Sequence, residues 1–140
     1  DVLQKACYPK SMRELLIHTK KEREIKDITS DIQEVVKEQG MQEGLCSLFL
    51  THTSAALTTA DLDRGTDLDM LDAFEAMVPK LNFRHPHNPE HVKDHIVASL
   101  IGPSLAVPVE KGELLLGPWQ KIVLVELGGP RERTIAITFS

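Results

Sequence analysis

The sequence predicts a single compact α+β domain with mostly antiparallel sheets and about three helices. Its 140 residues are close to the most common size of one domain. Helical spacing of apolar residues recurs three times, whereas the last third of the chain alternates like strands. Several strand segments are apolar on both faces, so we expect sheets covered twice, by helices and by another sheet or subunit. Residues 1–140 should form this domain, with 1–11 as a loosely held tail.

Six to eight strands are expected where apolar runs lie between turn residues. RELLIHT and REIKDI should form a first pair of strands, joined at Lys20-Lys21. GLCSLFLTHTSAALTTA should hold two strands on either side of residues 52–54, and Glu110-Lys111-Gly112 should turn a hairpin. In chain order, these segments are residues 13–19, 23–28, 44–60, 104–109, 113–117, 121–127 and 133–139.

The first helix is expected over residues 30–40, where Ser30 and Gln33 are spaced as a capping box and Gly40 ends the apolar periodicity. Its apolar face consists of Ile32, Val35 and Val36. Such a face predicts packing of this helix against a sheet.

The second helix should cover residues 66–79, with Thr66 as N-cap and acidic residues in the first turn, where the helix dipole favours them. The third should lie around residues 91–101 and end at Gly102-Pro103. For the second helix the predicted buried stripe consists of Met70, Phe74, Met77 and Val78.

The charge of the chain argues against two classes of partner. With a net charge of −5 and an isoelectric point near 5.7, nothing suggests binding to nucleic acid or to an acidic membrane surface. No segment has 18 consecutive apolar residues, and the start of the chain has no apolar stretch typical of a signal peptide. The expected compartment is therefore the cytoplasm.

Cys7 and Cys46 are too few for a disulfide framework or a four-thiolate zinc site. Cys46 lies in the apolar run LCSLFL, where a free cysteine is most often buried and inert.

Four of the six histidines lie in FRHPHNPEHVKDHI: His85, His87, His91 and His95. Imidazole is the commonest neutral ligand of zinc-like ions, so the cluster suggests a metal site. His91 and His95 have the helical spacing of zinc sites but lack the glutamate of H-E-x-x-H, which favours an ordinary solvated helix face. His85-x-His87 resembles a dinuclear hydrolase motif only faintly, because the acidic residue comes one place too late.

A catalytic zinc commonly draws its three ligands from separate elements, and His52 in LTHTSAAL is the candidate from outside the cluster. The alternative is a core histidine that bonds a neighbouring threonine. Three further candidates are Asp61 in an acidic stretch, the sole tryptophan Trp119, and Arg131 in the turn GGPRER. Each also has an ordinary interpretation: a surface charge for Asp61 and Arg131, and a core or interface anchor for Trp119.

Four stretches together resemble the YjbQ family, whose members are also called secondary thiamine-phosphate synthases. They are LTHTSAALT, HVKDHIVASLIGPSL, VPVEKGELLLGPWQKI and VELGGPRER, in the order and spacing of the family. The resemblance implies a YjbQ-like β-sandwich fold, a homotrimer, and sites near the subunit interfaces. It also implies a divalent metal, zinc or else Mg²⁺, on His52, His87 and His95, with His85 as the alternate to His87.

Three differences from the family leave the substrate open. Pro118 stands where the family has a threonine in G-T-W-Q, and Ala60-Asp61-Leu62 replaces N-E-N. The loop between His87 and His95 is also shorter than in many members.

The activity implied by the resemblance joins a pyrimidine pyrophosphate to a thiazole phosphate. Asp61 would then accept a proton or support the metal site, and Arg131 would clamp phosphate. The residues expected to bind substrate or phosphate are Thr53, Ser54, Ser99, Trp119 and Gln120. Two alternatives remain open: a metal-dependent hydrolase or lyase acting on a small anionic or phosphorylated metabolite, and a non-catalytic homotrimer that binds metal and ligand.

Overall fold

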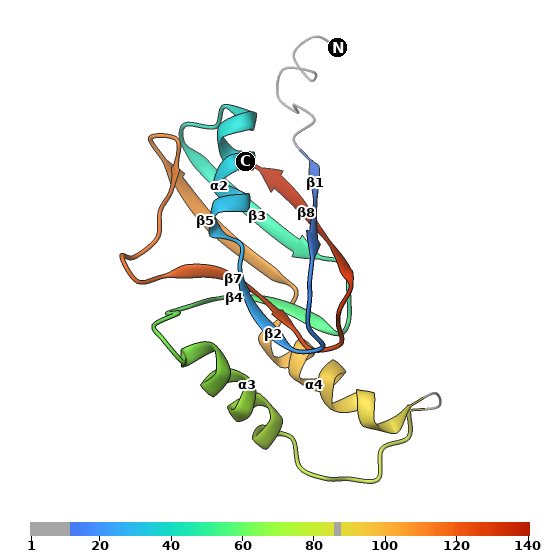
Figure 1. Ribbon diagram of the computed structural model, residues 1–140. Coiled ribbons are helices and arrows are strands. Elements are labelled where there is room, and N and C mark those ends of the chain that lie inside the picture. Colours follow the sequence, from blue (N-terminus) through green and yellow to red (C-terminus); the bar gives the residue numbers. More distant parts are fainter. Residues whose placement is uncertain (1–11, 86–87) are drawn as a thin grey trace, which may run out of the picture.

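In the computed structural model, which describes residues 12–85 and 88–140, the described chain passes back and forth between two antiparallel β-sheets and changes sheet six times (Figure 1). The larger sheet has the strand order β1-β8-β3-β5-β6 and the smaller one β2-β7-β4. The larger sheet comprises β1 (Arg13–His18), β3 (Gly44–Leu50), β5 (Ser104–Glu110), β6 (Glu113–Leu114) and β8 (Glu132–Phe139). The smaller sheet comprises β2 (Glu24–Asp27), β4 (Ala55–Ala60) and β7 (Lys121–Glu126).

Three α-helices occur in the described residues: α2 (Thr29–Gln39), α3 (Thr66–Met77) and α4 (Val92–Ile101), the last preceded by the short 3₁₀ helix η1 (Pro89–His91). Helices α3 and α4 lie beneath the smaller sheet (Figure 1). None of the helices in this part of the chain is both long and apolar enough to cross a membrane.

The apolar residues form two layers, one on each face of the smaller sheet. The first layer lies between the two sheets and α2 and includes Ile32, Leu48, Leu57, Leu124 and Ile137. The second lies between the smaller sheet and the helices α3 and α4 and includes Ala56, Val97, Ala98, Val123 and Val125. Strand β7 contributes alternate residues to the two layers, which explains why KIVLVEL is apolar throughout.

Several local predictions are confirmed. Helix α2 buries Ile32, Val35 and Val36 and ends at Gly40, whose φ of 69° is left-handed. The hairpin between β5 and β6 turns at Lys111 and Gly112, both at positive φ. Cys46 is buried, and burial raises the pKa of its thiol to about 11.

Three other local predictions are wrong, one of them because a tertiary contact uses the same side chain. The capping box does not form: Gln33 instead binds Gly112 O and Leu114 N, which ties α2 to the β5–β6 hairpin. Thr66 is the first residue of α3 and not its cap. Met77, predicted to be buried, is 64% exposed.

The first two strands are present but do not pair with each other. Strand β1 pairs with β8 in the larger sheet, whereas β2 pairs with β7 in the smaller one. The Lys20-Lys21 segment is therefore a crossing between sheets and not a hairpin turn.

A buried ion pair joins the two sheets at the end where three of the direct crossings lie, those of β1–β2, β3–β4 and β7–β8. Glu126 of β7 is fully buried and Arg133 of β8 is 1% exposed, and the guanidinium donates to both carboxylate oxygens. Glu126 also accepts from Thr19 Oγ1, at 2.6 Å, and from Gly128 N. Arg133 Nη2 also donates to the carbonyl oxygen of Ser54, at 3.2 Å, and to the hydroxyl of Ser54, at 2.9 Å. The pair thus bonds one residue of each of these three crossings: Thr19 between β1 and β2, Ser54 between β3 and β4, and Gly128 between β7 and β8.

Replacing Glu126 by glutamine should strongly destabilise the fold. The side chain keeps its shape, but Arg133 then remains buried without a counter-charge, which typically costs about 3–5 kcal/mol. Urea denaturation measures the free energy of unfolding. The control Glu38→Gln breaks the exposed pair with Arg13. This substitution should change the free energy of unfolding by less than about 1 kcal/mol. Equal, small losses in both variants would contradict a structural role for the buried pair.

The same variant should also remove part of the acid sensitivity. Burial by itself would raise the pKa of Glu126, but the hydrogen bonds from Arg133, Thr19 and Gly128 N–H outweigh burial and hold the pKa below its usual value. A lowered folded pKa means that the carboxylate stabilises the fold above the unfolded pKa of about 4.3 and loses this contribution as the pH falls through the folded pKa. The difference in free energy of unfolding between wild type and Glu126→Gln should therefore shrink below roughly pH 5. A difference that stays constant on acidification would contradict this prediction.

Candidate functional site

The turn between β3 and β4, residues 51–54, carries three of the predicted site residues. Its position is set from β8: Thr51 N donates to Thr134 O, at 3.3 Å, and Ser54 is bonded to Arg133. The segment H-T-S is therefore held by two consecutive residues of β8.

His52 accepts a hydrogen bond from the backbone of β8. Thr134 N lies 2.9 Å from Nε2, and because a backbone N–H can only donate, Nε2 must be unprotonated. The neutral ring consequently carries its hydrogen on Nδ1. The pKa of His52 is lowered, first by partial burial and then by the positive charges of Arg133 and Arg131, against an opposing effect of Glu126.

His95 is oriented by the same turn from the other side. Its Nδ1 lies 2.8 Å from Thr53 O, and because a carbonyl oxygen can only accept, Nδ1 carries the hydrogen and Nε2 keeps its lone pair. This is the arrangement in which histidines commonly bind zinc.

The two histidines line one pocket of about 430 Å³ between the turn and α4. This volume suits a small metabolite. The lining residues are His52, Thr53, Ala55, His95, Ala98, Ser99 and Pro103. The structure thus brings together four of the predicted site residues: His52, Thr53, His95 and Ser99.

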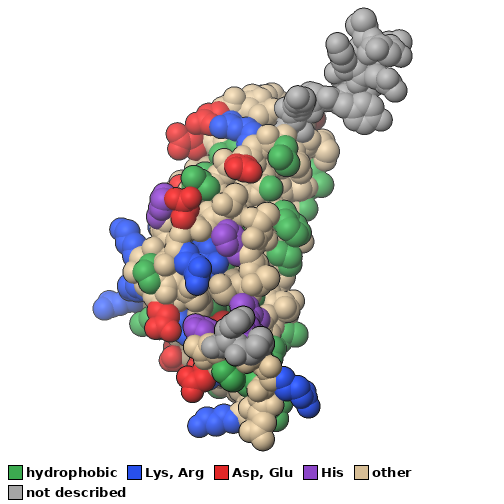
Figure 2. Space-filling model, turned by 90° about the vertical axis from the view of Figure 1, so that its right-hand side faces the viewer, with side chains coloured by type: hydrophobic (Ala, Val, Ile, Leu, Met, Phe, Trp, Pro, Cys, Tyr) green, Lys and Arg blue, Asp and Glu red, His purple; other side chains and the backbone are tan. Residues whose placement is uncertain are grey.

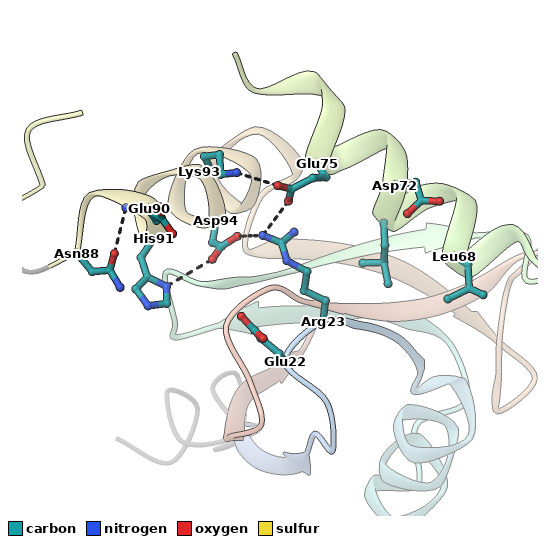
Figure 3. A pocket seen from close by; sticks show the side chains of 11 residues that line it. Glu22, Arg23, Leu68, Asp72, Glu75, Asn88, Glu90, His91, Lys93 and Asp94 are labelled. Carbon is teal, nitrogen blue, oxygen red and sulfur yellow. Dashed lines mark hydrogen bonds and ion pairs between the residues drawn. The ribbon is translucent and has the colours of Figure 1, made fainter. Parts of the chain in front are cut away.

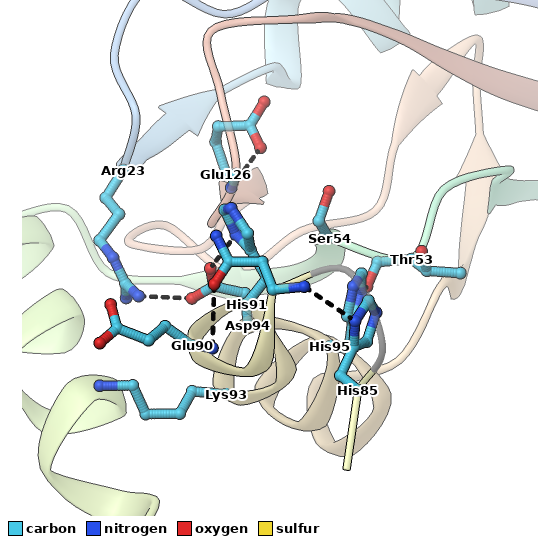
Figure 4. A network of polar contacts seen from close by, with 12 residues as sticks. Arg23, Thr53, Ser54, His85, Glu90, His91, Lys93, Asp94, His95 and Glu126 are labelled. Carbon is cyan, nitrogen blue, oxygen red and sulfur yellow. Dashed lines mark hydrogen bonds and ion pairs between the residues drawn. The ribbon is translucent and has the colours of Figure 1, made fainter. Parts of the chain in front are cut away.

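The ring of His85 stacks on that of His95, with the centroids 5.4 Å apart and the planes at 12° (Figure 4). Its Nδ1 accepts a long hydrogen bond, 3.5 Å, from Asn88 N. His87, the predicted third ligand, lies outside the described residues. Within 12–85 and 88–140, no three His, Cys, Asp or Glu side chains are grouped so that they could hold a metal ion.

Histidine side chains gather on one face of the molecule, around Lys or Arg side chains (Figure 2). Arg131 is exposed in the β7–β8 turn, and its Nε donates to Gly128 O. Its charge acts on His52, as expected of a group that could attract an anion toward this pocket.

Ser54 has a different place from the one predicted. Its hydroxyl accepts from Arg133 Nη2 and so forms part of the support of the turn. Ser54 does not line the pocket of His52 and His95.

Asp61, Trp119 and Gln120 lie away from the histidine pocket. They line an open pocket of about 350 Å³, and Asp61 and Trp119 also border a neighbouring one of about 510 Å³. Asp61 follows the last residue of β4, whereas His52 precedes the first, so about 20 Å of strand separates them. Trp119 is 76% exposed, so it is not a core residue. Gln120 bonds Gly117 N and Thr59 Oγ1 and holds its own loop.

A larger cavity, about 640 Å³, lies on the other side of α4 and contains His91 (Figure 3). Both the lysine and the arginine side chain of its lining are already paired with carboxylates: Asp94 binds Arg23, and Glu75 binds both Arg23 and Lys93. His91 Nδ1 is 3.6 Å from Asp94 Oδ2. Burial raises the pKa of Asp94 in spite of the Arg23 charge. This larger cavity therefore offers an anionic ligand no Arg or Lys side chain that is not already paired, among the residues that line it.

The buried pair of Glu126 and Arg133 was not predicted from the sequence. A signal was present, because Glu126 ends the apolar run KIVLVEL and Arg133 stands at an inward position of an alternating strand. Charges at such positions require buried partners. Thr134 acts through its backbone N–H, which no residue pattern reveals.

Comparison with known proteins gives one family. The profile described as UPF0047 protein YjbQ-like matches residues 13–140. A UPF0047 protein of Archaeoglobus fulgidus is 36% identical over 125 residues, covering 89% of this chain and 97% of the relative. The Bacillus subtilis protein YugU is 34% identical over 127 residues, covering 90% and 96%.

Solved structures agree with this result. A YbjQ-like protein of unknown function from Sulfolobus solfataricus P2 superposes with a TM-score of 0.83 at 32% identity, covering 91% of this chain and 94% of that one. A hypothetical protein from Aeropyrum pernix K1 gives 0.84 at 28% identity, covering 92% and 97%. With a matching profile over nearly its whole length and relatives above 30% identity, the chain belongs to the YjbQ-like family, UPF0047.

Proposed function

We propose that this protein is an enzyme that acts on a small anionic or phosphorylated metabolite in the pocket of His52 and His95. The observation that supports the proposal is that two imidazoles in different tautomers line a single pocket of about 430 Å³. His95 offers a lone pair on Nε2, and His52 offers an N–H on Nδ1. Ser99 adds a hydroxyl to the lining and Arg131 adds a nearby positive charge.

A divalent metal, zinc in the first place, would be held by His95 Nε2 together with a histidine of the preceding loop. His95 fits this role because Thr53 O fixes its Nδ1 as the protonated nitrogen. His87 is the proposed loop ligand and His85, which stacks on His95, is its alternate. His52 as held by Thr134 does not fit, because its Nε2 lone pair is already used. A bound zinc would stabilise negative charge on a substrate oxygen.

Two reactions belong to this proposal. Thiamine-phosphate synthesis releases pyrophosphate, and such chemistry normally uses Mg²⁺, which prefers oxygen ligands. An imidazole-lined pocket suits zinc better, which favours hydrolysis or elimination on a phosphorylated metabolite. A screen of phosphorylated metabolites, with the thiamine precursors included, distinguishes the two.

Assembly into a homotrimer is the second part of the proposal. No helix of the described residues covers the outer face of the larger sheet, and its centre is uncharged, with Phe49 50% and Leu16 48% exposed. Phe49 lies opposite Ala136 and Ser104 on the neighbouring strands. Exposed apolar patches of this kind mark protein interfaces. Because Asp61 and Trp119 lie at the far end of β4, they could contribute to the histidine pocket only from a neighbouring protomer.

Zinc binding should depend on His95 and not on His91. In His95→Ala the proposed ligand is lost, whereas His91 lines a separate cavity and serves as the matched control. Elemental analysis of purified protein should find zinc in wild type and His91→Ala and little in His95→Ala. Full zinc content in His95→Ala, or loss in His91→Ala, would contradict the proposed site.

Introducing a charge on the open sheet face should dissociate the trimer. Phe49→Glu places a carboxylate at the centre of this face, where burial against another copy would be unfavourable. Sedimentation analysis should show a trimer for wild type and mainly monomer for Phe49→Glu. The control Leu68→Glu alters an exposed leucine on α3, away from this sheet, and should remain trimeric. A trimer in both variants would place the interface elsewhere.

A further inference from the structure

We propose that His52 donates a hydrogen bond from Nδ1 to an anionic oxygen of the bound metabolite, and that it is not a metal ligand. The inference deepens the proposed function, on which it rests, by assigning separate tasks to the two histidines. His52 would hold the anion, and His95 would provide the lone pair.

The contact with β8 fixes the protonation state of the His52 ring. Thr134 N–H occupies the lone pair of Nε2, at 2.9 Å, and the remaining hydrogen of a neutral imidazole is then on Nδ1. Neither ring nitrogen has a lone pair left for a metal. Ligation through Nδ1 would require a doubly deprotonated ring, and ligation through Nε2 would require the ring to leave Thr134.

The His52 ring cannot move away from Thr134 without losing a hydrogen bond. Thr134 lies on β8 beside β3, and its carbonyl already accepts from Thr51 N. If His52 swung away, Thr134 N–H would lose the partner that it has in the structure, which is unfavourable for a partly buried backbone group. The turn itself is anchored two residues later, where Arg133 binds Ser54.

The Nδ1–H group of His52 remains available to a ligand in the pocket. Among the residues that the structure describes, Nδ1 of His52 has no hydrogen-bond partner, and the ring lines the pocket that Ser99 also lines. The two nitrogens of an imidazole point in widely different directions, so Nδ1–H is directed away from β8. The charges of Arg133 and Arg131 act on the ring, and although Glu126 opposes them, Glu126 is itself paired with Arg133. The exposed guanidinium of Arg131 therefore favours an anion as the acceptor.

His95 cannot take over this task. Its N–H is already given to Thr53 O, at 2.8 Å, so it offers only a lone pair, which an anionic oxygen does not accept. The metabolite that fits has an anionic group, such as a phosphate, at the His52 side. At the His95 side it has a proton to give or a group that binds metal.

The test uses zinc and inorganic phosphate as separate probes on three variants. His52→Ala removes the donor, whereas His52→Gln keeps an amide that can accept from Thr134 and donate to an anion but is a poor zinc ligand. His18→Ala is the control, since His18 lies on β1 outside the pocket and pairs with Glu132.

We expect every variant to retain the zinc content of wild type. Calorimetry with phosphate should show roughly tenfold or greater weakening in His52→Ala, the usual effect of losing a hydrogen bond to a charged group. Affinity in His52→Gln should stay within a few-fold, and His18→Ala should match wild type.

Two results would overturn the inference alone: loss of zinc in both His52 variants while His18→Ala retains it, or equal weakening of phosphate binding in His52→Ala and His52→Gln. Failure of wild type to bind phosphate would overturn it together with the proposed function. Nitrogen-15 NMR of the histidine rings gives an independent check. Addition of zinc should move the Nε2 resonance of His95 and leave that of His52 unchanged, and the reverse pattern would refute the assignment.

Discussion

The buried pair of Glu126 and Arg133 is the interaction on which the rest of this structure depends. It links a strand of the smaller sheet to a strand of the larger one, and it binds Thr19 from the β1–β2 crossing and Ser54 from the β3–β4 crossing. A buried ion pair adds little net stability compared with well-packed apolar residues. Its effect here is geometric, because it fixes where the chain changes sheets.

The candidate site is built directly on that geometry. Arg133 holds Ser54, the next residue Thr134 holds His52, and Thr53 between them orients His95. Both imidazoles therefore receive their protonation pattern from backbone groups, Thr53 O of the turn for His95 and Thr134 N–H of β8 for His52. Such groups are set in place by folding and need no rearrangement when a ligand arrives. This is why the pocket can present an N–H and a lone pair side by side.

The two sides of α4 border different cavities. On one face His95 meets the turn of His52, with His85 stacked on its ring. On the other, Asp94 of the same helix binds Arg23 and draws the β1–β2 crossing toward α4, while Glu75 of α3 binds the same guanidinium. The histidines at positions 91 and 95 are thus neighbours in sequence that serve different cavities.

The α+β class, the helices and nearly all the strands could be predicted from the sequence, because apolar periodicity and turn residues act locally. The sequence also suggested His52 and His95 as partners, and the structure places both in one pocket. The sequence did not determine which strands share a sheet, since the period of two is the same in either sheet. It also did not determine the states of the two imidazoles. Those depend on Thr53 O and Thr134 N–H, backbone atoms that nearly every residue type carries. Nor did the sequence show that Asp61 and Trp119 lie at the far end of β4, away from the histidine pocket. Only the tertiary structure, by bringing β8 beside the turn, decided which nitrogen of each ring remains available.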